Sequence, residues 1–152
     1  MSNLLFQYCP KLVVFNQNQS SVLLCKRQGE AEFDEVFSLI GGKMEHGDDS
    51  ILEALRREKT EEVGEDFKIE VLVDYSLNVF YVKKSGVRMV LPHHYARHLA
   101  GEPVLNEEYS EYLWVDLDEL EAFEPKVQNI GEIVHQMKNV KDFASPKGLQ
   151  VI

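Results

Sequence analysis

Apolar and polar residues alternate along this chain in a way that predicts many short strands and two helices. The stretch from Phe67 to Val73 has an apolar side chain at every second position, which is typical of a half-buried strand. Other apolar runs end at polar turns and also predict strands. Strands are expected at 11–16, 22–27, 36–40, 67–73, 78–83, 89–99 and 112–115, with polar loops at 17–21, 28–35 and 101–109. Residues 84–86 form the expected turn between two of these strands.

The first predicted helix has clear start and stop signals. Asp49 or Ser50 can cap its N-terminus, and Ser50 with Glu53 fits the Ser-x-x-Glu capping box. Gly64 stands where a C-terminal cap glycine is expected. These signals define a helix between a glycine-rich loop and a glycine stop.

The second predicted helix follows from apolar residues at helical spacing, namely Val127, Ile130, Val134 and Met137. Their stripe is expected to pack on the sheet. Strands with one helix on each face fit an α/β fold arranged as an α/β/α sandwich. The chain shows no linker or internal repeat, so residues 1–152 are expected to form a single domain.

Three carboxylates distinguish the first helix. Glu58, Glu61 and Glu62 have spacings i, i+3 and i+4, so they share one helical face. Arg57 is four residues from both Glu53 and Glu61, which predicts ion pairs on each side of it. An acidic helical face is commonly just solvated, but it also provides the oxygen ligands that Mg²⁺ prefers. The glycine-rich loop and capped helix around this trio favour the metal site.

The loop and helix together resemble the Nudix box. The second half of that motif is matched at Arg57, Glu58, Glu61, Glu62 and Gly64, and its opening Gly-Gly-Lys-x-Glu-x-Gly is matched at residues 41–47. Residues 22–27 and 111–120 resemble the strands that flank the box in this family. Such a long ordered match is far more specific than a lone short motif.

The resemblance implies a mixed β-sheet between the helices and a Mg²⁺- or Mn²⁺-dependent hydrolase of the diphosphate linkage in a nucleoside diphosphate derivative. It also implies that Glu58, Arg57 and Glu61 are catalytic residues. The implied metal ligands are Glu58, Glu61, Glu62 and the carbonyl of Gly42. The alternative is a catalytically weakened domain of the same fold that binds a nucleotide-like ligand for regulation.

The chain departs from the motif at three places. One inserted residue means that the first glutamate of the box corresponds to either Asp48 or Asp49. Glu65 replaces an apolar residue, and so does Lys59, which shares a helical stripe with leucines. We expect the Lys59 methylenes to cover apolar surface while its ammonium reaches water.

Outside the box, several charged residues are candidates for contact with the substrate. Arg27 and Lys43 could bind its phosphates, and the late polar loop offers Glu107, Glu108 or Glu111 as an additional carboxylate. His93, His94 and His98 suggest zinc, but His93 points to the opposite side of a strand from the other two, so a structural or substrate-edge role is favoured over a metal role. Trp114 has apolar neighbours and is expected in the core.

The charge and cysteine content narrow the function further. A net charge of −10 argues against general nucleic-acid or anionic-membrane binding, because the chain has no basic face to neutralise phosphates. No segment suits a membrane span or a signal peptide. Cys25 lies in an apolar run and is expected to be a buried free thiol. A cytoplasmic protein is therefore expected, with a small-molecule substrate as its partner and a homodimer left open.

Overall fold

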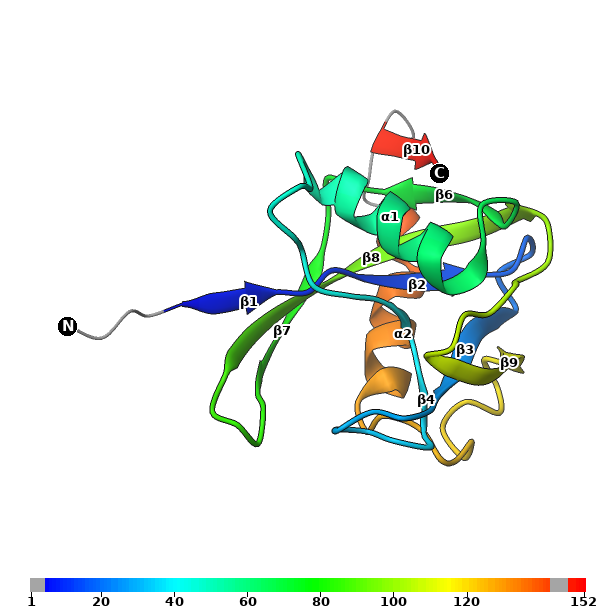
Figure 1. The fold of residues 1–152 in the computed structure, drawn as a ribbon. Helices are drawn as coiled ribbons and strands as arrows, with labels where there is room; N and C mark the ends of the chain where they lie inside the picture. The colour runs from blue at the N-terminus through cyan, green and yellow to red at the C-terminus, as the bar shows by residue number, and fades with distance from the viewer. Residues whose placement is uncertain (1–4, 143–147) are drawn as a thin grey trace.

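The computed structural model describes residues 5–142 and 148–152. Within them a mixed β-sheet lies between two α-helices, as Figure 1 shows, so the predicted α/β sandwich is confirmed. The strands are β1 (Phe6–Tyr8), β2 (Lys11–Phe15), β3 (Ser21–Arg27), β4 (Phe37–Ser38), β5 (Ile40–Gly41), β6 (Lys68–Leu72), β7 (Leu77–Val82), β8 (Arg88–Ala100), β9 (Tyr109–Asp116) and β10 (Leu149–Val151). The helices are α1 (Ile51–Val63), α2 (Ile130–Lys138) and the short 3₁₀ helix η1 (Val140–Asp142).

The long strand β8 organises the sheet. Its second half pairs with β2 in parallel and with β6 in antiparallel orientation, inside the layered body. Its first half pairs with β1 on one side and β7 on the other. These three segments extend away from the helices (Figure 1), and we call residues 5–9 and 77–92 the arm.

Strands β2 and β3 pair at Phe15 and Val22 and then separate. The segment before α1, which contains β4 and β5, lies between them. β4 pairs with β3 through Cys25 and Ser38, whereas β5 pairs with β2 through Lys11 and Gly41. The single strand predicted at 36–40 is therefore wrong, because this segment changes partner at Leu39. The pairing of β5 with β2 places the Gly-Gly turn directly beside the start of β2.

Each face of the sheet has its own apolar layer. The layer under α1 includes Leu12, Val14, Leu23, Cys25, Leu55, Val63, Phe67 and Ile69. The layer under α2 includes Val13, Phe15, Val22, Leu24, Tyr95, Ile133, Val134 and Met137. Alternate residues of one strand thus pack against different helices, as a two-faced sheet requires. The predicted burial of the free thiol of Cys25 is confirmed.

Helix α1 begins and ends where its sequence signals predict. The Ser50 hydroxyl accepts a hydrogen bond from the Glu53 N–H (3.1 Å), and the Gly64 N–H donates to the Thr60 carbonyl (3.1 Å). The expectation for Lys59 is wrong in one respect. The residue is 1% exposed, and its ammonium donates to the carbonyls of Gly64 and Glu65 rather than reaching water. Carbonyls at the end of a helix lack helical partners and attract a cation.

Two other expectations change at the edges of elements. Val127 lies before α2 rather than within it, because its N–H donates to the Phe37 carbonyl (3.0 Å) and ties it to β4. The short strands β1 and β10 were not predicted. No helix in the part of the chain that the structure describes is long and apolar enough to cross a membrane.

The histidines at the centre of β8 form hydrogen bonds with the backbone. His93 and His94 are both buried; Nδ1 of His93 donates to the Leu91 carbonyl (2.9 Å) and Nδ1 of His94 donates to the Leu72 carbonyl (3.1 Å). Burial disfavours the charged imidazolium, so the pKa of His93 falls from 6.5 to about 4 and that of His94 also falls.

These buried histidines contribute stability that is lost in mild acid, whereas Glu62, whose pKa is raised to about 8, contributes in the opposite direction. A histidine with a lowered pKa in the folded state gains its proton more easily on unfolding, so stability is retained above pH 6.5 and lost as the pH falls toward 4. For His93 alone, the free energy of unfolding should drop by about 2 kcal/mol between pH 7 and pH 5. Urea unfolding of the wild type and of His93→Gln at both pH values measures this contribution, as the difference between the pH dependences of the two proteins. His46→Gln, at an exposed position, should keep the wild-type pH dependence.

Candidate active site

The Gly-Gly turn brings backbone closer to its neighbours than any side chain would allow. Gly41 has φ +130°, and a Cβ built there would lie 2.3 Å from the Pro10 carbonyl oxygen. A Cβ on Gly42 would lie 2.5 Å from the Glu58 carboxylate. The two glycines therefore let the turn pack against β2 on one side and against the carboxylates of α1 on the other.

Glu62 is the carboxylate most deeply enclosed by this arrangement. It is 1% exposed, and both of its oxygens have partners. The Gly41 N–H donates to Oε2 (2.8 Å), and the Tyr109 hydroxyl donates to Oε1 (3.1 Å). Burial raises the pKa of Glu62 to about 8, although Lys11 and the Gly41 N–H oppose the shift.

Glu58 and Glu61 have different surroundings on the same helical face. Glu58 is buried beside Gly42, and burial raises its pKa while Arg57 lowers it. Glu61 is exposed. Negative charge on Glu108 raises the pKa of both Glu58 and Glu62. Three carboxylates, those of Glu58, Glu62 and Glu108, thus lie close enough to the turn to influence one another's surroundings electrostatically.

Arg57 connects the loop to these carboxylates. Its Nε and Nη2 donate to the two oxygens of Asp48 (2.9 Å each), and Nη2 also donates to the Lys43 carbonyl (3.0 Å). On the helix side, its Nη1 lies 3.0 Å from Glu58 and 3.3 Å from Glu61. The bidentate contact holds the pKa of Asp48 below its usual range. Of the two aspartates left open by the motif, Asp48 is the one that contacts Arg57.

The pair predicted between Arg57 and Glu61 is present, whereas Glu53 instead pairs with Arg56. Arg57 therefore orients the loop from one side while it neutralises part of the carboxylate charge on the other.

The late loop between β8 and β9 supplies one carboxylate to this region. Glu108 is half-buried and interacts electrostatically with Glu58 and Glu62, whereas Glu107 and Glu111 are exposed and Glu111 lies opposite Lys26 in the sheet. The structure thus brings Glu108, among the three candidates, near the carboxylates of α1.

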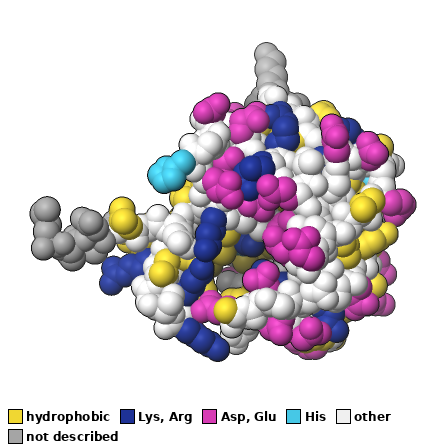
Figure 2. All heavy atoms as spheres, viewed as in Figure 1, with side chains coloured by type: hydrophobic (Ala, Val, Ile, Leu, Met, Phe, Trp, Pro, Cys, Tyr) yellow, Lys and Arg dark blue, Asp and Glu magenta, His cyan; other side chains and the backbone are white. Residues whose placement is uncertain are grey.

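The basic residues predicted to contact phosphates lie around the same region. Arg27 forms an ion pair with Glu30 (3.4 Å), and its Nε has no hydrogen-bond partner among the described residues. Lys43 is exposed and lies near Lys83, whose pKa is lowered by burial and by that second ammonium group. Figure 2 shows acidic side chains gathered over α1 and basic side chains beside a hollow next to them.

The donor set suits a hard divalent cation. Burial raises the pKa of both Glu58 and Glu62, and negative charge on Glu108 adds to both shifts; a bound cation would relieve this repulsion. The carboxylates are not arranged as a complete metal site, however. The residues that the structure describes contain no group of three acidic, histidine or cysteine side chains placed to hold an ion.

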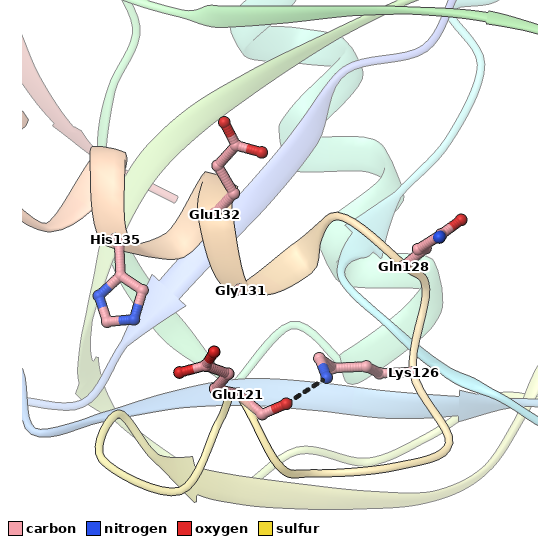
Figure 3. A pocket seen from close by; sticks show the side chains of 6 residues that line it. All are labelled: Glu121, Lys126, Gln128, Gly131, Glu132 and His135. Carbon is pink, nitrogen blue, oxygen red and sulfur yellow. Dashed lines mark hydrogen bonds between the residues drawn. The ribbon is translucent and has the colours of Figure 1, made fainter.

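Other candidate features lie apart from these carboxylates. His98 stacks on Phe67 (4.8 Å between ring centres) beside Trp114, consistent with the packing roles predicted. A cavity of about 320 Å³ on the α2 face, shown in Figure 3, is lined by Glu121, Lys126, Gln128, Gly131, Glu132 and His135. The Lys126 ammonium donates to the Glu121 carbonyl (3.1 Å) within this cavity.

Two contacts of the site were missed from the sequence. They are the hydrogen bonds from the Gly41 N–H and the Tyr109 hydroxyl to Glu62. Tyr109 is 47 residues from its partner, so no local spacing could have identified it.

Comparison with known proteins agrees with this arrangement. The family profile described as the NUDIX domain matches residues 10–137. No curated protein matches the chain significantly. Among solved structures, the chain is similar to the MutT protein of Methanosarcina mazei Go1 (TM-score 0.71, 18% identity, covering 90% of this chain and 95% of that one).

Two further structures show the same fold. One is a binary complex of a Caenorhabditis elegans Ap4A hydrolase (TM-score 0.72, 16% identity, covering 91% of this chain and 99% of that one). The other is the NUDIX domain of Shewanella oneidensis NrtR complexed with ADP ribose (TM-score 0.68, 17% identity, covering 92% and 90%). The chain belongs to the NUDIX family and is a Nudix-type hydrolase that acts on a phosphoanhydride bond.

Proposed function

We propose that this protein uses Mg²⁺ or Mn²⁺ to hydrolyse the diphosphate linkage of a nucleoside diphosphate derivative. The observation that carries the proposal is the packing of Glu58 and Glu62 against the Gly-Gly turn, with Arg57 and backbone donors holding them. Burying carboxylates costs free energy, and a bound cation that also contacts a phosphate would offset that cost.

The residues divide the work as follows. Glu58, Glu61, Glu62 and the Gly42 carbonyl would hold the cation, which when bound would neutralise the diphosphate and activate water. Glu58 positions or deprotonates the attacking water, since it is partly desolvated and its pKa is raised. Arg57 orients Glu58 through its 3.0 Å contact and keeps the loop in place through Asp48.

The substrate side is proposed from charge and from the solved structures. Lys43 and Arg27 bind phosphate oxygens, and Glu108 provides an additional carboxylate beside the cation. The structural relatives include an Ap4A hydrolase and a domain complexed with ADP ribose, which supports a nucleotide derivative as the substrate class. The alternative is a domain that binds such a ligand for regulation without turnover.

A second copy of the chain is the proposed macromolecular partner, through the arm. Phe6 and Phe80 are 48% and 58% exposed and their rings lie 6.2 Å apart. The arm also carries Lys83, Lys84 and Arg88 and no acidic residue, in a chain of net charge −10. An apolar, basic projection fits the acidic body of another copy.

The proposed hydrolysis predicts that Glu62→Gln is folded but nearly inactive. A glutamine can accept from the Gly41 N–H and donate to the Tyr109 oxygen, so both contacts survive, but its neutral amide is a poor ligand for Mg²⁺. Phosphate release should fall by orders of magnitude in a screen of nucleoside triphosphates, nucleotide sugars, dinucleotides and coenzymes with MgCl₂ or MnCl₂.

Glu65→Gln, at an exposed position after the helix, is the matched control and should retain activity. Hydrolysis of any of these substrates at an undiminished rate without added metal would contradict the proposed metal dependence. A wild-type protein that is inert on the whole panel, yet binds one of these nucleotides tightly, would instead support the regulatory alternative.

The two glycines of the turn should respond differently to alanine. Gly42→Ala places a methyl group against the flexible end of Glu58, so the fold should persist while kcat falls by about 100-fold because the carboxylate is displaced. Gly41→Ala meets the rigid backbone of Pro10 and should cost about 3 kcal/mol or more of stability. Thermal unfolding and kcat measured on both variants separate the effects, and a Gly42→Ala enzyme with wild-type kcat would contradict the close packing of Glu58.

The arm predicts self-association that weakens with salt. Sedimentation equilibrium should show a dimer at low ionic strength and dissociation at high salt, because charge attraction between arm and body is screened. Phe80→Ser should yield a monomer. Val151→Ser, which changes a similarly exposed residue (61%) on β10, should leave the dimer intact. A wild-type monomer at all concentrations would exclude the second copy as partner.

A further inference from the structure

Tyr109 is a buried polar residue to which the proposed reaction mechanism gives no role. It is the first residue of β9, is 4% exposed, and donates its hydroxyl proton to Glu62 Oε1 (3.1 Å). The other oxygen of Glu62 accepts from the Gly41 N–H (2.8 Å). The two donors come from different parts of the chain and meet on one carboxylate.

This pair of donors fixes the orientation of the Glu62 carboxylate. The last torsion of a glutamate side chain is broad, so a single hydrogen bond leaves the carboxylate plane free to turn. Donors on both oxygens remove that freedom. Each oxygen keeps a second lone pair, so a carboxylate held in this way remains able to bind a cation.

Tyr109 is itself held in place by its surroundings. Its ring packs in the apolar layer under α1, and its backbone is paired with Arg27 in the sheet. The Gln28 amide donates to the Glu107 carbonyl (2.9 Å), and the Asn106 N–H donates to the Glu62 carbonyl (3.3 Å). The hydroxyl therefore transmits the position of β9 and the late loop to the carboxylate on α1.

We propose that Tyr109 is the positioning residue for the metal-binding carboxylate Glu62, and that it sets the late loop with Glu108 in register with α1. The inference rests on the proposed function, because it gives Glu62 the role of metal ligand. Tyr109 acts through Glu62 and touches neither substrate nor cation. Residues that orient metal ligands commonly change metal affinity by 10–100-fold when they are removed.

The test compares Tyr109→Phe with Tyr112→Phe. Both changes remove one tyrosine hydroxyl from β9, but that of Tyr112 donates to Glu102 (3.1 Å), outside the carboxylate group. Titration calorimetry with MgCl₂ and no substrate should give a Kd about 10- to 100-fold weaker for Tyr109→Phe and unchanged for Tyr112→Phe. The rise in melting temperature that Mg²⁺ gives the wild type should shrink in Tyr109→Phe alone.

Kinetics provide a second readout that a purely structural role would not move. The MgCl₂ concentration for half-maximal rate should rise in Tyr109→Phe, while KM for the substrate at saturating MgCl₂ should stay near the wild-type value. Equal Mg²⁺ affinity in the two variants and the wild type would overturn the proposal. A wild type that binds no Mg²⁺ and hydrolyses nothing would instead overturn the proposed function itself, so the two failures are distinguishable.

A measurement on the unaltered site covers the case in which Tyr109→Phe does not fold. The full chain labelled with 3-fluorotyrosine gives ¹⁹F signals that can be assigned by elimination, using Tyr→Phe variants at the other tyrosines. Addition of MgCl₂ should shift the signal of Tyr109 and leave that of Tyr112 in place. An unchanged Tyr109 signal at saturating MgCl₂ would count against the proposal.

Discussion

The burial of the Glu62 carboxylate is the constraint on which the rest of this site depends. It joins α1, the Gly-Gly turn and β9 through two hydrogen bonds to one side chain. An apolar residue would fill the same space without the cost of removing a carboxylate from water. Such a residue would, however, leave the Gly41 N–H and the Tyr109 hydroxyl without an acceptor; a neutral acceptor would serve both, whereas the proposed cation requires a carboxylate.

The glycines make this enclosure geometrically feasible. Gly41 passes against the backbone of β2, and Gly42 lies against Glu58, so the turn reaches the helix at distances that exclude any Cβ. Arg57 then closes the other side by binding Asp48 and the Lys43 carbonyl. Asp48, one of the two aspartates that the sequence offered for the first carboxylate of the motif, is thereby fixed against α1.

The sequence predicted the parts of this structure that local signals determine. Helix α1 follows from its cap at Ser50 and its stop at Gly64, and both signals act within a few residues. The change of partner at Leu39 and the contact of Tyr109 depend on strands far away in the chain, so periodicity could not find them. Lys59 was misjudged for a different reason: its partners Gly64 and Glu65 are close in the sequence, but only the end of the folded helix turns their carbonyls toward the ammonium.

The same burial that weakens the metal-free protein would favour a cation at the proposed site. Burial and the negative charge of Glu108 oppose the ionisation of Glu58 and Glu62, so the folded state is destabilised when these carboxylates are charged. A cation that binds only the folded protein removes the repulsion, and its binding free energy adds to stability. The Gly41 N–H and the Tyr109 hydroxyl fix the Glu62 carboxylate, so it cannot turn away from the neighbouring negative charges. The proposed cation site therefore depends on electrostatic repulsion between carboxylates that the Gly-Gly turn and β9 hold in place.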